Sequence, residues 1–218
     1  MYGWKNWRGL SLISVLSICG SPTPESSTEF LLKHTVETIR ASVAPAKVRL
    51  RLVHLNDLSF AACQSCGEDP TPRWCFLDDD LNGVYAELAR ADCVLFGSPI
   101  YFDAVSAQAK AFIDRGNCFR PADFNNVDPS HDFIKRLSQK RPGAIVLVGG
   151  ERAWFEGARR CIAGWFKWLE IVNEGVLMFY SQDFTRSGEA TGYPEAVAEA
   201  EELGRHLGEL LRREYGRS

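Results

Sequence analysis

The 218-residue sequence has no excess of basic residues, with 25 Lys and Arg against 28 Asp and Glu and a formal net charge of -3. Nucleic acids are therefore poor candidate partners, because a protein that follows a phosphate backbone presents a field of positive charge. No apolar run approaches the roughly 20 residues that cross a bilayer, so we expect no membrane span. Neither a Walker A loop nor a Gly-x-Ser-x-Gly motif occurs, which argues against an ATPase and a serine hydrolase.

The seven cysteines do not form a complete set of pairs, as a disulfide-stabilised secreted protein would need. Cys19 and Cys93 lie inside apolar runs typical of buried strands, so a reducing compartment fits better and we expect a cytoplasmic protein. Residues 1–19, with Lys5 and Arg8 before an apolar stretch, have the outline of a short signal peptide. We expect this stretch to be the first strand instead, because the loop that follows needs a strand to present it.

The apolar periodicity switches between strand and helix several times along the chain. This alternation favours an α/β domain with a parallel sheet. We predict one domain over residues 1–218, a flavodoxin-like three-layer sandwich with strand order 2-1-3-4-5 and helices on both faces. A polar, cysteine-bearing loop insertion is expected at about residues 56–80. We expect strands at residues 12–19, 47–55, 92–97, 144–148 and 171–180, and helices at 30–43, 81–90, 105–115, 154–169 and 194–214.

A hydroxyl-rich loop, Gly20 to Thr28, joins the first expected strand to the first expected helix. A helix N-terminus presents free backbone N–H groups and the positive end of the helix dipole, and Ser and Thr add hydroxyl donors at the same place. The loop is a candidate phosphate site, although Ser, Pro and Thr are also ordinary turn and capping residues. Its position supports a ligand, because open parallel sheets bind ligands at the carboxyl ends of their strands.

Two more loops follow expected strands at the same edge of the sheet. In the segment from Gly97 to Phe102, small residues allow close approach to a ligand, and the adjacent Tyr101 and Phe102 offer a face for a planar ring. In the segment from Gly149 to Arg152, glycines at a strand end expose main-chain donors. Each loop alone is explained by core aromatics and plain turns, but three loops meeting at the switch point favour one ligand site.

A specific series of motifs runs through the middle of the chain. It consists of Cys63-Gln64-Ser65-Cys66, Cys75, Asp78-Asp79-Asp80, the segment from Ala91 to Phe102, Val105-Ser106-Ala107 and the segment from Lys110 to Arg115. These motifs resemble the flavodoxin-like NAD(P)H-dependent FMN reductases and iron–sulfur flavoproteins, and the resemblance covers about residues 14–180.

The resemblance implies bound FMN, with its phosphate at the first loop and its isoalloxazine beside the second and third. It also implies NAD(P)H as co-substrate and a homodimer or homotetramer in which a neighbouring subunit helps to close the flavin site. The implied cofactor-binding residues are Ser21, Ser26, Ser27, Thr28, Ser98, Pro99, Ile100, Tyr101, Phe102, Gly149, Gly150 and Glu151.

The chain departs from the pattern of these families in two places. Family members usually have a basic residue in the phosphate loop, where this chain has Glu25, whose carboxylate would repel a phosphate unless it points to solvent. Cluster-binding members have a compact run of four cysteines, and this chain has Asp69 three residues after Cys66, which leaves Cys63, Cys66 and Cys75.

Four thiolates are normally needed to hold an iron–sulfur cluster, so we expect no resident metal. Three interpretations of the three cysteines stay open: simple thiols, ligands of a metal or cluster completed by a distant or partner-chain residue, and a dithiol switch.

The expected function is an FMN-dependent oxidoreductase that takes a hydride from NAD(P)H and passes electrons to a quinone, a flavin or another small acceptor. We single out no catalytic residue, because the cofactor carries the chemistry. One alternative is an FMN-binding electron-transfer flavoprotein that works with a protein partner, with an atypical iron–sulfur cluster as an added possibility. Another is a flavodoxin-fold binding module without a cofactor.

Overall fold

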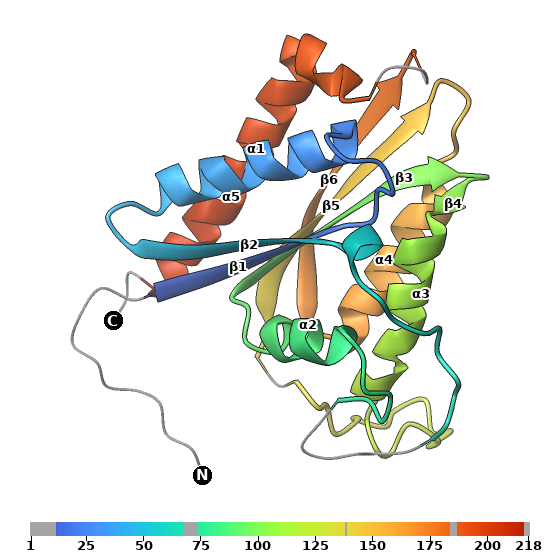
Figure 1. Ribbon diagram of the computed structural model, residues 1–218. Coiled ribbons are helices and arrows are strands. Elements are labelled where there is room, and N and C mark those ends of the chain that lie inside the picture. Colours follow the sequence, from blue (N-terminus) through green and yellow to red (C-terminus); the bar gives the residue numbers. More distant parts are fainter. Residues whose placement is uncertain (1–11, 68–73, 138, 184–186, 216–218) are drawn as a thin grey trace.

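The computed structural model describes residues 12–67, 74–137, 139–183 and 187–215. Within these residues a six-stranded sheet forms the centre and helices lie on both of its sides (Figure 1). The strands are β1 (Leu12–Cys19), β2 (Lys47–His54), β3 (Cys93–Tyr101), β4 (Ala104–Val105), β5 (Arg141–Gly150) and β6 (Ile171–Ser181). The helices are α1 (Ser27–Ser42), α2 (Leu81–Leu88), α3 (Ala107–Arg115), α4 (Glu156–Trp168) and α5 (Pro194–Tyr215), with short 3-10 turns η1 (Leu55–Asp57), η2 (Gly116–Phe119) and η3 (Glu189–Gly192).

In the described part of the chain, five strands pair in parallel in the order β2-β1-β3-β5-β6. The two-residue strand β4 pairs antiparallel with the end of β3. With β4 set aside, the predicted flavodoxin-like order is confirmed. The strand order reverses at β1, so the switch point of the sheet lies at the carboxyl ends of β1 and β3.

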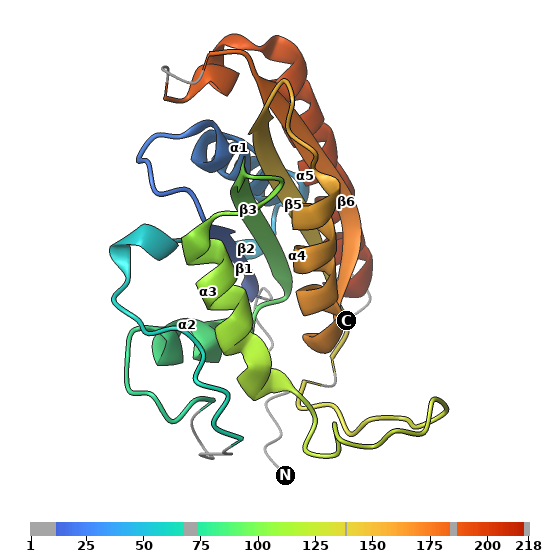
Figure 2. The ribbon, with the colours of Figure 1, turned by 90° about the vertical axis from the view of Figure 1, so that its right-hand side faces the viewer.

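The helices form the two outer layers of the sandwich. Helices α1 and α5 cover one face of the sheet, where Leu31 and Leu207 pack with the β1 core. Helices α2, α3 and α4 cover the other face, where Phe112 and Trp165 pack with Phe96 (Figure 2). The predicted three-layer arrangement is therefore present. No helix in the described ranges is both long and apolar enough to cross a bilayer.

The burial of the strands explains their sequence patterns. Every residue of β3 from Cys93 to Ile100 is buried, because helices cover both faces of this central strand. The edge strand β2 instead alternates exposed Lys47, Arg49 and Arg51 with half-buried apolar residues. This alternation is typical of a strand at the edge of a sheet.

The strand β3 is longer than its apolar run predicts. Residues Ser98 to Tyr101 continue the strand, because β4 pairs with Ile100 and Tyr101. The prediction of a loop from Gly97 to Phe102 is therefore wrong for most of this segment. The carbonyl oxygen of Gly97 accepts the N–H of Gly20 on the β1 side. Pro99, two residues further on, faces the same neighbour, but the pairing of β1 with β3 has already ended at Gly97. The proline has no N–H to donate, and β1 has no carbonyl there that would need one.

Two glycines test how closely the layers pack. A Cβ at Gly143 would clash with the Ile171 side chain and come within 2.6 Å of the Val94 carbonyl oxygen, whereas a Cβ at the exposed Gly164 of α4 would meet nothing. We expect Gly143→Ala to lower the free energy of unfolding by about 1–3 kcal/mol through overpacking. Gly164→Ala should raise it by about 0.5–1 kcal/mol through helix propensity. Urea unfolding followed by circular dichroism measures both changes, and equal destabilisation by the two substitutions would contradict this packing.

Candidate functional site

A cleft of about 280 Å³ opens where β1, β3, β5 and β6 end. This is the edge of a parallel sheet at which ligands bind. It brings together most of the predicted site residues, namely Ser21, Ser26, Ser27, Thr28, Pro99, Ile100, Tyr101, Gly149 and Gly150. Three predicted residues do not line it, namely Ser98, Phe102 and Glu151.

One wall of the cleft is the N-terminus of α1, which begins at Ser27, so Ser27 and Thr28 belong to the helix and not to the expected loop. The Oγ of Ser26 caps the helix by accepting the N–H of Glu29 at 3.2 Å. The carboxylate of Glu29 reaches back to the N–H of Glu25 at 2.8 Å. The N–H groups of Ser27 and Thr28 have no acceptor among the described residues. Two helix N-terminal donors are therefore available to an anion.

Thr28 serves both the packing and the cleft. Its side chain is buried, and its methyl group packs so closely on the end of β3 that a Cβ at Gly97 would come within 2.8 Å of it. Its hydroxyl makes no hydrogen bond within the described part of the chain, and the residue lines the cleft. Glycine at position 97 thus lets the helix approach the strand and leaves the Thr28 hydroxyl free for a ligand.

Hydrogen bonds hold the ends of β1 and β3 together beneath the cleft. The N–H of Gly20 donates to the Gly97 carbonyl at 2.8 Å, and the Ser106 hydroxyl donates to the Gly20 carbonyl at 2.6 Å. Ser98 is fully buried, and its Oγ accepts the Ser106 N–H at 3.0 Å and donates to the Pro99 carbonyl at 2.8 Å. Ser98 therefore supports the cleft from below.

The hairpin between β3 and β4 projects beyond the cleft. Its central residues, Phe102 and Asp103, have φ values of 51° and 59°, as a type I′ turn requires. The Asp103 carboxylate accepts the N–H of Trp154 at 2.9 Å and so ties the hairpin to the segment before α4. Tyr101 is 47% exposed and lines the cleft, whereas Phe102 is fully exposed at the turn.

The third predicted loop begins later than expected, because Gly149 and Gly150 are the last residues of β5. A Cβ at Gly149 would come within 2.6 Å of the Ala153 side chain, so the turn after the strand needs glycine there. Glu151 is exposed beyond the strand and lies outside the cleft lining.

Sequence reasoning missed the wall formed by the end of β6 and the loop after it. This wall contributes Ser181, Asp183, Ser187 and Gly188. The buried carboxylate of Glu189 holds it by accepting the Ser181 hydroxyl and the N–H of Asp183. Burial alone would raise the pKa of Glu189, but these hydrogen bonds keep its pKa below the ordinary value. The sequence had one signal for this wall, which is the run of hydroxyl and glycine residues directly after the last expected strand, at 171–180.

The same wall is bonded to the first loop. The Ser187 hydroxyl donates to the Glu25 carbonyl at 3.3 Å, and the Ala190 N–H donates to the Ser27 hydroxyl at 3.0 Å. Gly188, at a φ of 66°, lies so close that a Cβ would come within 2.7 Å of the Glu25 carbonyl oxygen. The two loops therefore form one structure around the α1 N-terminus.

The charges around the cleft differ from those of a basic phosphate site. None of its described lining residues is Lys, Arg or His, and Asp183 is the one carboxylate among them. Glu25 is exposed and does not line the cleft, so it exerts no close repulsion. Burial alone would raise the pKa of Glu29, but the ammonium of Lys33, at 2.5 Å, lowers it below the ordinary value. An anion here would be held by N–H groups and hydroxyls.

Comparison with known proteins identifies the family. The family model described as NADPH-dependent FMN reductase matches residues 13–181. The chain belongs to this family. Membership confirms the predicted class, the FMN-dependent oxidoreductases with a flavodoxin-like fold.

The relatives include iron-sulfur flavoproteins. One from Methanocaldococcus jannaschii is 31% identical over 140 residues, which span 64% of this chain and 64% of that protein, a little under two thirds. Another, from Methanosarcina thermophila, is 26% identical over 162 residues, which span 73% of this chain and 74% of that protein.

Solved structures show the same fold at low identity. A flavone reductase superposes with a TM-score of 0.64 at 16% identity, covering 90% of this chain and 62% of that one. An FMN-dependent NADH-azoreductase of Bacillus anthracis superposes with a TM-score of 0.58 at 12% identity, covering 91% of this chain and 100% of that one.

The cleft fits the FMN that the family implies. The unpaired N–H groups of Ser27 and Thr28 and the free Thr28 hydroxyl suit a phosphate. Gly149 and Gly150 line the cleft without side chains, so the main chain at the end of β5 is open to a planar ring. The donor set is that of an anion next to a flat, largely apolar group.

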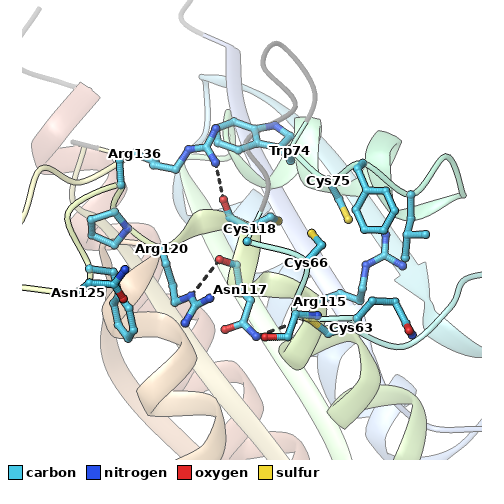
Figure 3. A pocket seen from close by; sticks show the side chains of 18 of the residues that line it. Cys63, Cys66, Trp74, Cys75, Arg115, Asn117, Cys118, Arg120, Asn125 and Arg136 are labelled. Atoms are coloured by element: carbon cyan, nitrogen blue, oxygen red, sulfur yellow. Dashed lines mark hydrogen bonds between the residues drawn. The ribbon is translucent and has the colours of Figure 1, made fainter.

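A second cavity, of about 420 Å³, lies at the far end of α3, where Arg115 lines it (Figure 3). Its lining includes four cysteines, Cys63, Cys66, Cys75 and Cys118. It also includes four basic residues, Arg115, Arg120, Lys135 and Arg136, and its described lining contains no carboxylate. All seven cysteines of the chain are free thiols.

A buried ion pair organises the segments around this cavity. The guanidinium of Arg115, whose side chain is 1% exposed, bonds both carboxylate oxygens of Asp79 at 2.7 and 3.1 Å. It also donates to the carbonyl of Ala61 at 2.7 Å, and Asp79 accepts the N–H of Ala61 at 3.3 Å. One ion pair thus joins the end of α3 to the segments that contain Cys63 and Cys75.

The ion pair gives a testable prediction for stability. Burial alone would raise the pKa of Asp79, but Arg115 and the Ala61 N–H lower it, so the pair stabilises the fold above the ordinary Asp pKa of about 3.9 and loses this effect as the pH falls. We expect Arg115→Met to lower the free energy of unfolding at pH 7 by about 3–5 kcal/mol, because Asp79 is left without its partner. The difference from wild type should narrow below about pH 4.

Urea unfolding at pH 7 and pH 3.5 measures these differences. The matched control is Lys110→Met on the same helix, because Lys110 and Asp114 form an exposed pair at 2.7 Å that contributes at most about 1 kcal/mol. Equal losses from the two substitutions would show that the buried pair does not organise this region.

Proposed function

We propose that the protein binds FMN in the cleft at the carboxyl ends of the sheet, accepts a hydride from NAD(P)H and passes the electrons to a quinone, a free flavin or another small acceptor. The observation that carries the proposal is the pair of unpaired N–H groups at Ser27 and Thr28 beside glycine strand ends, in a chain of the FMN reductase family.

The proposed cofactor contacts follow from the placement of each residue. The N-terminus of α1 and the loop before it would hold the phosphate, with Ser21, Ser26, Ser27 and Thr28. The ends of β3 and β5 would border the isoalloxazine, with Pro99, Ile100, Tyr101, Gly149 and Gly150, and Ser98 would support them from below. Phe102 and Glu151, in the turns after these strands, would contact the cofactor only from outside the cleft lining.

When bound, FMN supplies a hydride acceptor and a carrier of electrons. The chain supplies position: the helix N-terminus fixes one end of the ligand, and the β3 and β5 ends fix its flat part. Among the described lining residues no His, Lys or Arg is present to move a proton. We therefore assign orientation, and no acid or base role, to this chain's side chains.

We also propose that the protein acts as a homodimer or homotetramer in the cytoplasm. Phe102 is fully exposed, and Trp154 and Tyr180 are 74% and 50% exposed. Large aromatic side chains in the open near a ligand cleft suit coverage by a second copy. The seven free thiols support a reducing compartment.

A second candidate function is electron transfer with a protein partner. Its support is that the relatives from Methanocaldococcus jannaschii and Methanosarcina thermophila are iron-sulfur flavoproteins and that this chain has a cysteine-lined cavity. This function shares the FMN cleft with the first and differs in the electron donor.

We expect Thr28→Val to weaken FMN binding about tenfold or more. The substitution keeps the methyl group that packs on Gly97 and removes the hydroxyl, and a hydrogen bond to a charged acceptor contributes about 1.5–3 kcal/mol. Titration of apoprotein with FMN, followed by quenching of flavin fluorescence, measures the dissociation constant.

The control is Thr38→Val on the same helix, whose hydroxyl donates to the His34 carbonyl at 2.9 Å, outside the cleft. It should leave FMN affinity unchanged. An unchanged affinity in Thr28→Val as well would place the phosphate elsewhere.

Anaerobic mixing of the FMN-loaded protein with NADH and NADPH separates the two candidate functions. We expect at least one nucleotide to bleach the flavin absorbance within minutes of manual mixing. A quinone added afterwards should restore the absorbance. A flavin that is reduced by dithionite and by neither nucleotide would reject the hydride-transfer function and favour electron transfer with a protein partner.

A further inference from the structure

The cysteine-lined cavity contains a thiol that the sequence motif does not include. The motif leaves Cys63, Cys66 and Cys75, one short of the four thiolates that an iron–sulfur cluster takes. The structure adds Cys118, from the turn η2 directly after α3, to the same lining (Figure 3). We propose that Cys63, Cys66, Cys75 and Cys118 are the four ligands of an iron–sulfur cluster, with Cys118 as the ligand that completes the set.

Independent contacts bring η2 to the first cysteine. The Asn117 side chain donates to the Cys63 sulfur at 3.5 Å, and the Ser65 N–H donates to the same sulfur at 3.4 Å. Residue 118 is the next in the chain, so the contact at Asn117 sets Cys118 beside the segment of Cys63 and Cys66. These N–H groups are also the kind of donor that stabilises a metal-bound thiolate.

The buried ion pair places the third segment. Arg115 joins Ala61, two residues before Cys63, to Asp79, four residues after Cys75. Trp74, next to Cys75, packs on Phe119, next to Cys118, with ring centroids 4.6 Å apart. Each cysteine segment is thus fixed by its own contact to the end of α3.

The charges in the cavity suit a cluster. Four thiolates around an iron–sulfur core have a net negative charge, which nearby cations stabilise. Arg120 and Arg136 line the cavity and donate to the carbonyls of Asn117 and Cys118 at 3.4 and 2.6 Å. Their charges therefore lie next to the proposed ligands, and no carboxylate is present in the described lining.

The number of thiols and the size of the cavity suit a cluster better than a single ion. One zinc ion holds its ligand sulfurs at about 2.3 Å from one centre. Among the described residues, no three Cys, His, Asp or Glu side chains form such a group. Four thiols in the lining of one cavity of about 420 Å³ match the number of ligands of a cluster, which attach to separate iron atoms. Each thiol would release its proton on ligation.

The proposed cluster is separate from the flavin cleft. Ser106 caps α3 next to the cleft, and Arg115 is the last residue of the helix, next to the cavity. The nine residues of α3 place the two ends of the helix about 13 Å apart. Loss of the cluster should therefore leave FMN binding intact, and the two proposals can fail independently.

The test compares three proteins produced and purified without oxygen. We expect wild type to contain iron and acid-labile sulfide in equal amounts, about two or four of each per chain. Cys118→Ser should lose at least three quarters of both, whereas Cys161→Ser should keep them, because Cys161 is a half-buried thiol of α4 outside the cavity. FMN content, measured after release from the protein, should be the same in all three.

Native alkylation followed by mass spectrometry gives a second measurement on wild type alone, which stands even if the Cys118 variant does not fold. The reaction of Cys118 with iodoacetamide should rise at least fivefold after a chelator removes the iron, and that of Cys161 should not change. Wild type with no iron, wild type with about one zinc per chain, a Cys118→Ser variant with full iron, or unchanged alkylation of Cys118 would each overturn the proposal.

Discussion

The parallel pairing of β1 with β3 is the constraint on which the cleft depends. The chain leaves β1 toward the edge strand β2 and returns to place β3 on the other side of β1, so no connection covers the ends of these two strands. The bond from Gly20 to Gly97 fixes these ends, and α1 starts a few residues later. The free donors at its N-terminus are thus a direct result of the strand order.

A single short helix then relates the cleft to the cysteine cavity. At its first turn, the capping residue Ser106 bonds the end of β1. At its last residue, Arg115 bonds the segments that contain the cysteines. Because α3 packs on the sheet through Phe112, neither end can shift without the other. The geometry of both places is set by one rigid element.

The strands and their order could be predicted because the central strands are continuous apolar runs, and a parallel sheet with helices on both faces allows few arrangements. The end of β3 could not, because its pairing with β4 is a tertiary contact that periodicity does not encode. The wall at Ser181 was missed because hydroxyl and glycine residues after a strand are also ordinary turn residues. Cys118 was not placed because its approach to Cys63 depends on the ion pair of Arg115.

The edge strand β2 has a further consequence for the behaviour of the protein at high concentration. An edge strand offers unpaired main-chain groups to any other strand, and charged side chains along it discourage such pairing. Lys47, Arg49 and Arg51 are exposed along β2, and Arg51 is paired with Glu87 at 2.6 Å, so a second copy that approached this edge would meet the positive charges of Lys47 and Arg49. At the opposite edge, β6 exposes Val172 and Met178 instead. The basic residues of β2 therefore make strand addition less favourable at that edge than at β6.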